Sequence, residues 1–342
     1  MEREGRFFIS EAETGVRCVL CPHYCKIPGG VCGVRGNQNG IPFYGHVTAF
    51  AVDPIEKKPL FHFRPGTEIL SVGFAGCNLS CPFCQNWRIS RTEPSIPGER
   101  MTPADIVFAA LDRGIRAIAY TYSEPLVHAE FLLDCMSLAR EQGIANVLVT
   151  NGCANTEAAG EILSLIDAAN IDLKCFSSET YAQTLGGAKG TLETVLAFIR
   201  LAHAKKVHVE ITTLVVPGMN DSDTELDACA DFIASLNAEA DIPWHLSAYH
   251  PSYRYNAPPT DPAFLLRVKE RVRKKLRFVY VGNIPGEEND TFCLDCDALL
   301  VRRLGYRTET GGLAEPRKGE GFFRCAKCGG RTGINFCLQM QA

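Results

Sequence analysis

Two hydrophobic periods alternate along the central part of the chain. Short apolar runs of strand length are separated by longer segments in which apolar positions return every three or four residues. The first pattern predicts buried strands and the second predicts amphipathic helices. The predicted strands are Ile69–Phe74, Ala117–Tyr122, Ala145–Thr150, Ala169–Lys174, Val207–Val216, Trp244–Tyr249 and Arg277–Val281. The predicted helices are Thr102–Arg113, Val127–Gln142, Glu157–Asp167, Thr191–Lys205, Asp223–Leu236 and Pro262–Lys275.

The order of these elements predicts the fold class. Strands that alternate with helices are typical of βαβ units around a parallel sheet. Thr102-Pro103 has the sequence of a helix start, and Gly114 and Gly143 lie where helices should end. The number of units favours an α/β fold with a partial (β/α)6 TIM-like barrel, whose chemistry lies at the carboxyl ends of the strands. We divide the chain into an N-terminal Cys-rich segment (1–62), this barrel (63–285) and a C-terminal zinc-ribbon-like segment (286–342).

Composition narrows the class of protein. The 342 residues are 46% hydrophobic, which allows one large domain with smaller attachments. The net charge of −4 gives no case for a nucleic-acid partner or an anionic membrane. The first residues are charged and no stretch approaches a membrane span, so we expect a cytoplasmic protein without a secretory leader. Sixteen cysteines in such a chain indicate metal binding rather than disulfides.

Three of the cysteines lie close together directly after the first predicted strand. Cys77, Cys81 and Cys84 have the spacing C-x₃-C-x₂-C. A closed zinc or iron–sulfur site takes four protein ligands. Three thiols without a near fourth therefore indicate a cluster with one open metal corner, where chemistry can occur. The alternative is three ordinary buried thiols.

Two further sets contain four cysteines each. Cys18, Cys21, Cys25 and Cys32 could close around zinc or a second cluster, and here we favour a structural site over an electron relay. Cys293, Cys296, Cys325 and Cys328 form two paired knuckles, which predict a zinc-ribbon or rubredoxin-like site. Zinc ribbons can bind nucleic acid, but basic and acidic residues are mixed between these knuckles, so no basic patch is predicted.

Polar residues at the ends of later strands are further candidates. They are Glu124, Asn151, Asp172, Lys174 and His250. A carboxylate such as Glu124 could accept a hydrogen bond from an ammonium group. Strand alternation places Asp172 and Lys174 on the same side. The plainer interpretations are a solvated or capping carboxylate, a strand-end ion pair and a loop histidine.

The segment Gly76–Trp87 resembles the cluster loop of radical S-adenosylmethionine (SAM) enzymes. More narrowly, the chain resembles enzymes related to the pyruvate formate-lyase activating enzyme, and among these the radical SAM member of the AmmeMemoRadiSam system. The narrower likeness includes Ile55–Phe63 and Cys21–Cys25. The resemblance runs from about residue 16 to about residue 330.

The resemblance implies a [4Fe–4S] cluster on Cys77, Cys81 and Cys84, with SAM on the fourth iron. One electron, from a donor such as flavodoxin or ferredoxin, would cleave SAM to a 5′-deoxyadenosyl radical that takes hydrogen from an unidentified substrate. Glu124 corresponds to the acid of the family's Gly-Gly-Glu motif, although Tyr122 and Ser123 replace the glycines. Asn151, Asp172, Lys174 and His250 would contact the cofactor. Val149 replaces an aspartate of the family's cation site, so the resemblance does not extend to that cation.

Several functions remain open at this point. Within the resemblance, the enzyme could activate a glycyl-radical partner or act directly on a small molecule or peptide, and the flanking segments favour direct chemistry. Outside it, the chain could be a non-catalytic iron–sulfur electron-transfer protein or a zinc-ribbon nucleic-acid module. The strand-end residues would then have no role, and the acidic net charge argues against the last option.

Overall fold

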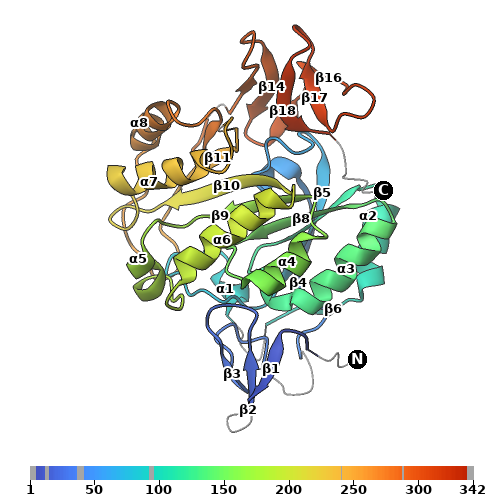
Figure 1. Cartoon of the computed structure of the whole chain (residues 1–342), viewed down its shortest axis with the longest axis vertical. Coiled ribbons are helices and arrows are strands. Elements are labelled where there is room, and N and C mark those ends of the chain that lie inside the picture. The colour runs from blue at the N-terminus through green and yellow to red at the C-terminus, as the bar shows by residue number, and fades with distance from the viewer. Residues whose placement is uncertain are drawn as a thin grey trace.

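A computed structural model describes residues 5–11, 15–36, 42–91, 96–239, 241–286 and 289–336. Its centre is a nine-stranded sheet of order β12-β11-β10-β9-β8-β7-β5-β4-β6 (Figure 1). The strands that pair in parallel are β5 (Glu68–Phe74), β7 (Ala117–Thr121), β8 (Ala145–Thr150), β9 (Ala168–Asp172), β10 (His208–Val215), β11 (Trp244–Ala248) and β12 (Val279–Gly282). These are the predicted strands. Because β12 and β6 end the order, the barrel is open, and the predicted fold class is confirmed.

Two strands of this sheet were not predicted. β4 (His46–Pro54) pairs antiparallel with β5, and β6 (Glu99–Arg100) pairs with β4. β4 carries apolar residues on both faces, and Phe50 and Val52 are 37% and 41% exposed, so its sequence lacks the alternation that identifies a strand. β4 lies within the segment 1–62, and the division of the chain into three parts stays a prediction.

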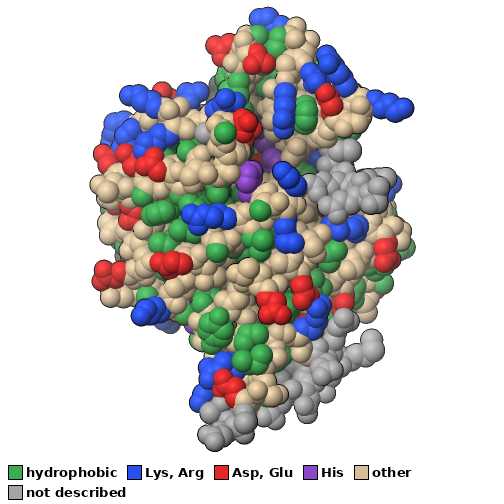
Figure 2. All heavy atoms as spheres, viewed as in Figure 1, with side chains coloured by type: hydrophobic (Ala, Val, Ile, Leu, Met, Phe, Trp, Pro, Cys, Tyr) green, Lys and Arg blue, Asp and Glu red, His purple; other side chains and the backbone are tan. Residues whose placement is uncertain are grey.

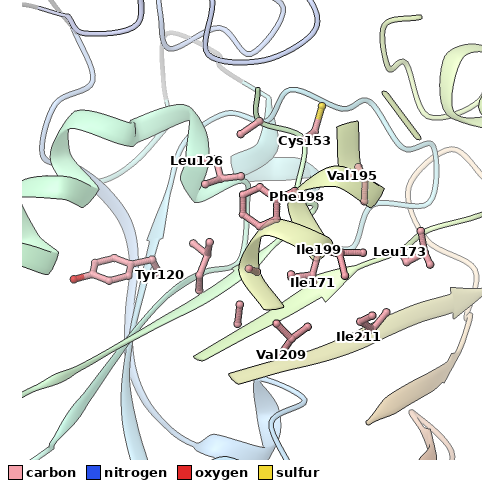
Figure 3. Close-up of a cluster of buried hydrophobic side chains, with 14 of the residues drawn as sticks. Tyr120, Leu126, Cys153, Ile171, Leu173, Val195, Phe198, Ile199, Val209 and Ile211 are labelled. Atoms are coloured by element: carbon pink, nitrogen blue, oxygen red, sulfur yellow. The ribbon is translucent and has the colours of Figure 1, made fainter. Parts of the chain in front are cut away.

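Helices cover the outside of the sheet (Figure 1). They are α1 (Trp87–Ser90), α2 (Pro103–Asp112), α3 (Ala129–Glu141), α4 (Thr156–Leu163), α5 (Ser178–Gln183), α6 (Thr191–Ala204), α7 (Asp223–Ala234) and α8 (Pro262–Val272), with the 3₁₀ helices η1 (Ile55–Lys57) and η2 (Pro125–His128). Thr102 and Asp105 form the capping box that starts α2. Figure 3 shows how α6 packs: Val195 and Phe198 lie over the sheet beside Ile171. In the described ranges, no helix is long and apolar enough to cross a membrane.

Two small modules flank the barrel at opposite ends of the molecule (Figure 1). The N-terminal module is the antiparallel sheet of β1 (Phe8–Glu11), β2 (Gly15–Cys18) and β3 (Lys26–Ile27). The C-terminal module contains two three-stranded sheets, made of β13 (Thr291–Phe292), β14 (Leu299–Leu304) and β15 (Arg307–Glu309), and of β16 (Leu313–Ala314), β17 (Phe322–Cys325) and β18 (Arg331–Asn335).

The C-terminal module covers the amino ends of the barrel strands. Ile55 and Phe63 pack there in one buried cluster with alanines that begin β7, β8 and β9. The guanidinium of Arg303, itself 1% exposed, donates a 2.6 Å hydrogen bond to the carbonyl of Phe61. This bond joins the module to the segment 55–63. The carboxyl ends of the strands, where the predicted site lies, face away from this module.

Candidate active site at the carboxyl ends of the strands

The loop that carries the three cysteines is fixed by segments from across the fold. The amide of Ser80 donates to the carbonyl of Leu185 at 2.7 Å, and the amide of Arg254 donates to the carbonyl of Pro82 at 2.9 Å. Gly186 adopts φ +68°, and a Cβ there would meet Ser80 Oγ at 1.9 Å, so only glycine allows this approach. The three cysteines, called the trio below, thus lie on a constrained loop.

The trio thiols are free and sheltered. Cys81 is buried, and Cys77 and Cys84 are half-buried. Burial raises the pKa of the Cys77 thiol, and the nearby Glu124 charge raises it further. These thiols are not gathered tightly enough for one metal ion. Thiols that hold a cluster lie around several iron atoms and are therefore farther apart. The donor set fits a cluster.

Glu124 is the centre of a buried hydrogen-bond network. It is 1% exposed and accepts from Thr150 Oγ1 at 2.6 Å, from the amide of Asn151 at 2.8 Å and from the amide of Leu126 at 3.0 Å. The solvated interpretation of this carboxylate is therefore wrong, whereas its capping of η2 is real. Burial raises its pKa to about 7, against the opposing effect of these donors. A cationic ligand would favour the ionised form of this buried acid.

Asn151 connects this network to the trio loop. Its Nδ2 donates to Asn78 Oδ1 at 2.9 Å and lies 3.8 Å from Cys77 Sγ. Asn78 Nδ2 in turn donates to the carbonyl of Cys153 at 2.7 Å. The ends of β5, β7 and β8 therefore meet around Cys77. Neither Asn78 nor Cys153 was among the predicted site residues. The position of Asn78 directly after the first trio cysteine was the available signal.

Asp172 and Lys174 form the expected ion pair, with Nζ 2.8 Å from Oδ2. Burial opposes the charge of Lys174, but Asp172 and Cys81 together raise its pKa well above the ordinary value. The carbonyl of Lys174 accepts from Asn220 Nδ2 at 2.6 Å, which fixes the chain after β9. This pair thus brings a cation and a carboxylate to the side of Cys81.

His250 lies farther along the row of strand ends. It is exposed after β11, and its Nε2 donates to the carbonyl of Asn283 at 3.0 Å. β11 is separated from β9 by β10 in the sheet, so this histidine belongs to the rim of the site. Its contact in this structure is with the end of β12 rather than with the trio loop.

Tyr122 occupies the position where the resemblance has a glycine. It has φ +71°, a left-handed conformation that costs a bulky residue about 1–3 kcal/mol. Its hydroxyl donates to Asp53 Oδ2 at 2.7 Å, and Lys58 Nζ lies 4.5 Å from its ring centroid. Lys58 also pairs with Asp53 at 2.7 Å. The backbone turn before Glu124 is therefore kept, with a buried polar group holding the tyrosine. This contact was not predicted from the sequence.

The C-terminal cysteines can hold a single metal ion. The four thiols lie within 4.8 Å of one another, and the pairs Cys293–Cys328 and Cys296–Cys325 are each 3.7 Å apart. Thiolates around tetrahedral zinc, with Zn–S bonds of ~2.3 Å, are separated by about 3.8 Å. Figure 2 shows positive and negative side chains mixed on the visible face of this module, and Arg303 is buried.

The N-terminal cysteines line one small cavity together with His23 and Arg35. Cys18 and Cys21 are buried there, whereas Cys25 and Cys32 are half-buried. The four sulfur atoms are more widely spaced than those of the C-terminal set, because no three of them lie within 4.8 Å of one another.

Comparisons with known proteins agree with this site. The radical SAM superfamily model matches residues 71–228. An uncharacterised protein of Methanocaldococcus jannaschii is 38% identical over 97% of this chain and 99% of its own length. The pyruvate formate-lyase-activating enzyme of Clostridium pasteurianum is 28% identical over 48% of this chain and 69% of that enzyme. The crystal structure of a radical SAM methyltransferase from Sphaerobacter thermophilus shares the fold at 15% identity, with a TM-score of 0.51 over 64% of this chain and 67% of its own. The chain belongs to the radical SAM superfamily and is an enzyme related to the pyruvate formate-lyase activating enzymes.

Proposed function

We propose that this enzyme holds a [4Fe–4S] cluster on Cys77, Cys81 and Cys84 and binds SAM at the open corner. One observation supports this most: Glu124, Asn151 and the Asp172–Lys174 pair meet the trio from neighbouring strand ends. The bound cluster and SAM would supply a 5′-deoxyadenosyl radical that removes hydrogen from the substrate. An electron donor of the flavodoxin or ferredoxin class completes the scheme.

The residues of the chain have separate roles in this proposal. Glu124 accepts a hydrogen bond from the ammonium group of SAM. Its buried carboxylate can do so because it has about four acceptor sites and only three donors among the described residues. Asn151 keeps the trio loop in register with Glu124 through Asn78. Lys174, paired with Asp172, places a positive charge near Cys81, where it could contact an anionic group of the bound ligand. His250, exposed at the rim after β11, would contact the cofactor from there.

The test is anaerobic reconstitution followed by reduction in the presence of SAM. We expect an iron–sulfur EPR signal that SAM shifts, and 5′-deoxyadenosine as a product. The variant Cys77→Ala/Cys81→Ala/Cys84→Ala should give neither, whereas Cys229→Ser, which changes a thiol on the buried face of α7, should behave like the wild type. A reduced, fully loaded wild type whose EPR signal ignores SAM would contradict the proposal and favour the non-catalytic electron-transfer alternative.

Glycyl-radical activation is the second candidate. Its support is the names of relatives: the Clostridium pasteurianum protein, and a putative glycyl-radical enzyme activating enzyme of Methanocaldococcus jannaschii that is 26% identical over 43% of this chain. Those matches cover about half of the chain or less. Incubation with candidate partner enzymes separates the options, since only an activase generates a protein-based glycyl radical detectable by EPR.

A further inference from the structure

We infer that the four N-terminal cysteines bind a second iron–sulfur cluster, which relays single electrons to the trio. The sequence left zinc and a cluster open at Cys18, Cys21, Cys25 and Cys32, and favoured a structural site. The spacing of the thiols, a buried arginine and the position of the cavity now favour the relay. The four cysteines and this arginine lie outside the superfamily match, which begins at residue 71.

The first observation is the spacing of the thiols. All four line one cavity whose other lining residues include no carboxylate. An all-thiol set suits zinc or an iron–sulfur cluster. No three of these thiols come within 4.8 Å of one another, whereas the C-terminal four all do in the same structure. One zinc ion needs thiolates about 3.8 Å apart. A cluster places irons and sulfides between its thiolates, so the wider N-terminal set fits the larger group.

The second observation is Arg35. It lines the cavity, is 1% exposed and pairs with Glu130 at 2.6 Å. Its Nε has no hydrogen-bond partner in the described part of the chain. A site with four thiolates is anionic, and the unpartnered Nε of this buried guanidinium, whose charge Glu130 already balances, offers it a spare donor. The amide of Val31 also lies 3.5 Å from Cys25 Sγ, and donors of this kind tune cluster potentials.

The third observation is the position of the cavity beside the trio loop. Gly76 has φ +86°, and a Cβ there would lie 2.5 Å from the carbonyl oxygen of Cys32. Since Gly76 precedes Cys77, the Cα atoms of Cys32 and Cys77 lie within roughly 10 Å. His23 Nε2 donates to the carbonyl of Asn78 at 2.8 Å. The N-terminal set therefore contacts the trio loop through its backbone at two points.

The electron path has an entrance and an exit. Solvent reaches the outer side of the set, where Tyr24 and Val31 are 47% and 52% exposed next to Cys25 and Cys32. One electron from a reduced ferredoxin or flavodoxin would lower the second cluster by one unit of charge and then pass to the cluster of the trio, with no bond made or broken. The relay rests on the proposed function, whereas the presence of the second cluster does not.

The decisive variant removes the trio and leaves the N-terminal set intact. Anaerobically purified Cys77→Ala/Cys81→Ala/Cys84→Ala should retain iron and sulfide, about two to four atoms of each per chain, and an EPR signal on reduction that SAM does not change. Zinc should remain at about one per chain, held by the C-terminal set. An iron-free variant with about two zinc ions per chain would overturn the inference.

The reciprocal variant is Cys25→Ser/Cys32→Ser, which changes two half-buried thiols, and its control is Cys135→Ser, which changes a buried thiol of α3 outside the cysteine sets. The reciprocal variant should keep the SAM-sensitive EPR signal and form 5′-deoxyadenosine with dithionite at the wild-type rate. With reduced flavodoxin or ferredoxin as the donor, it should form 5′-deoxyadenosine at least about tenfold more slowly than the wild type. Equal rates with the protein donors would overturn the relay. If the wild type forms no 5′-deoxyadenosine while the trio variant keeps its iron, the proposed function is contradicted. The inference of a second cluster is then still supported. Should the reciprocal variant misfold, the trio variant alone decides the metal content.

Discussion

The two four-cysteine sets contain the same ligands but lie at opposite ends of the barrel. The C-terminal set belongs to a module that covers the amino ends of the strands, and its thiols are already spaced for one ion. The N-terminal set lies beside the carboxyl ends, where the trio and Glu124 are. In barrels of this kind the amino ends serve stability and the carboxyl ends serve chemistry. In our proposal, location and spacing, rather than composition, therefore separate the structural metal from the functional one.

The largest effect should come from removing one thiol of the C-terminal set. Cys325→Ser should lose about one zinc ion per chain and unfold the C-terminal module, because structural zinc contributes about 10–16 kcal/mol of binding free energy. SAM cleavage should stay within a factor of about three, since the trio lies at the other end. Metal analysis and hydrogen exchange over 291–335 measure the first effect. Loss of SAM cleavage while the barrel stays folded would break the comparison.

The next effect concerns the polar group that holds the turn before Glu124. Asp53→Asn leaves Lys58, 2% exposed, without its counter-charge. Removing one partner of a buried pair costs about 3–5 kcal/mol. We expect this loss in urea unfolding, and Asp53→Asn/Lys58→Met should recover part of it. Unchanged stability of the single variant would show that Asp53 does not hold this turn.

A smaller effect is expected at Glu124 itself. Glu124→Gln replaces a charged acceptor by a neutral one of the same shape, so SAM should bind about 1.5–3 kcal/mol more weakly, or roughly 10–150-fold. Anaerobic titration of the reconstituted enzyme with SAM measures this change. Glu179→Gln, on the exposed side of α5, is the matched control and should bind normally. Equal affinities would remove Glu124 from the ligand site.

Over a single pH unit, the smallest effect is the response to acid at the contact between the barrel and the C-terminal module. His62 is buried there with Nε2 2.7 Å from Tyr280 Oη, and burial lowers its pKa to about 3. Below pH 6.5 the His62 imidazole binds a proton in the unfolded chain but stays neutral in the folded protein. Stability should therefore fall as pH drops from about 6.5 towards 3, by up to about 1.4 kcal/mol per pH unit from this residue. His62→Gln should flatten the profile of unfolding free energy against pH, and an unaltered profile would contradict this assignment.

The sequence predicted the parallel strands and most of the helices that support the site. It missed β4, which is apolar on both faces, and α5, which is only six residues long. It placed Glu124, Asn151, Asp172 and Lys174 at strand ends but could not tell that Glu124 is buried. It also missed the contact between Tyr122 and Asp53, which are far apart along the chain.

What the sequence alone determined is local: the periods that define strands and helices, the three cysteine spacings and the open corner that the trio implies. These signals depend on residues within one turn, strand or loop. Only the tertiary structure decided which cysteine set adjoins the trio, because the contact between Cys32 and Gly76 joins segments separated by β4 and β5. It also decided the spacing of the thiols, since a pattern of cysteines counts residues along the chain, whereas a metal ion or a cluster responds to distances between sulfur atoms in space.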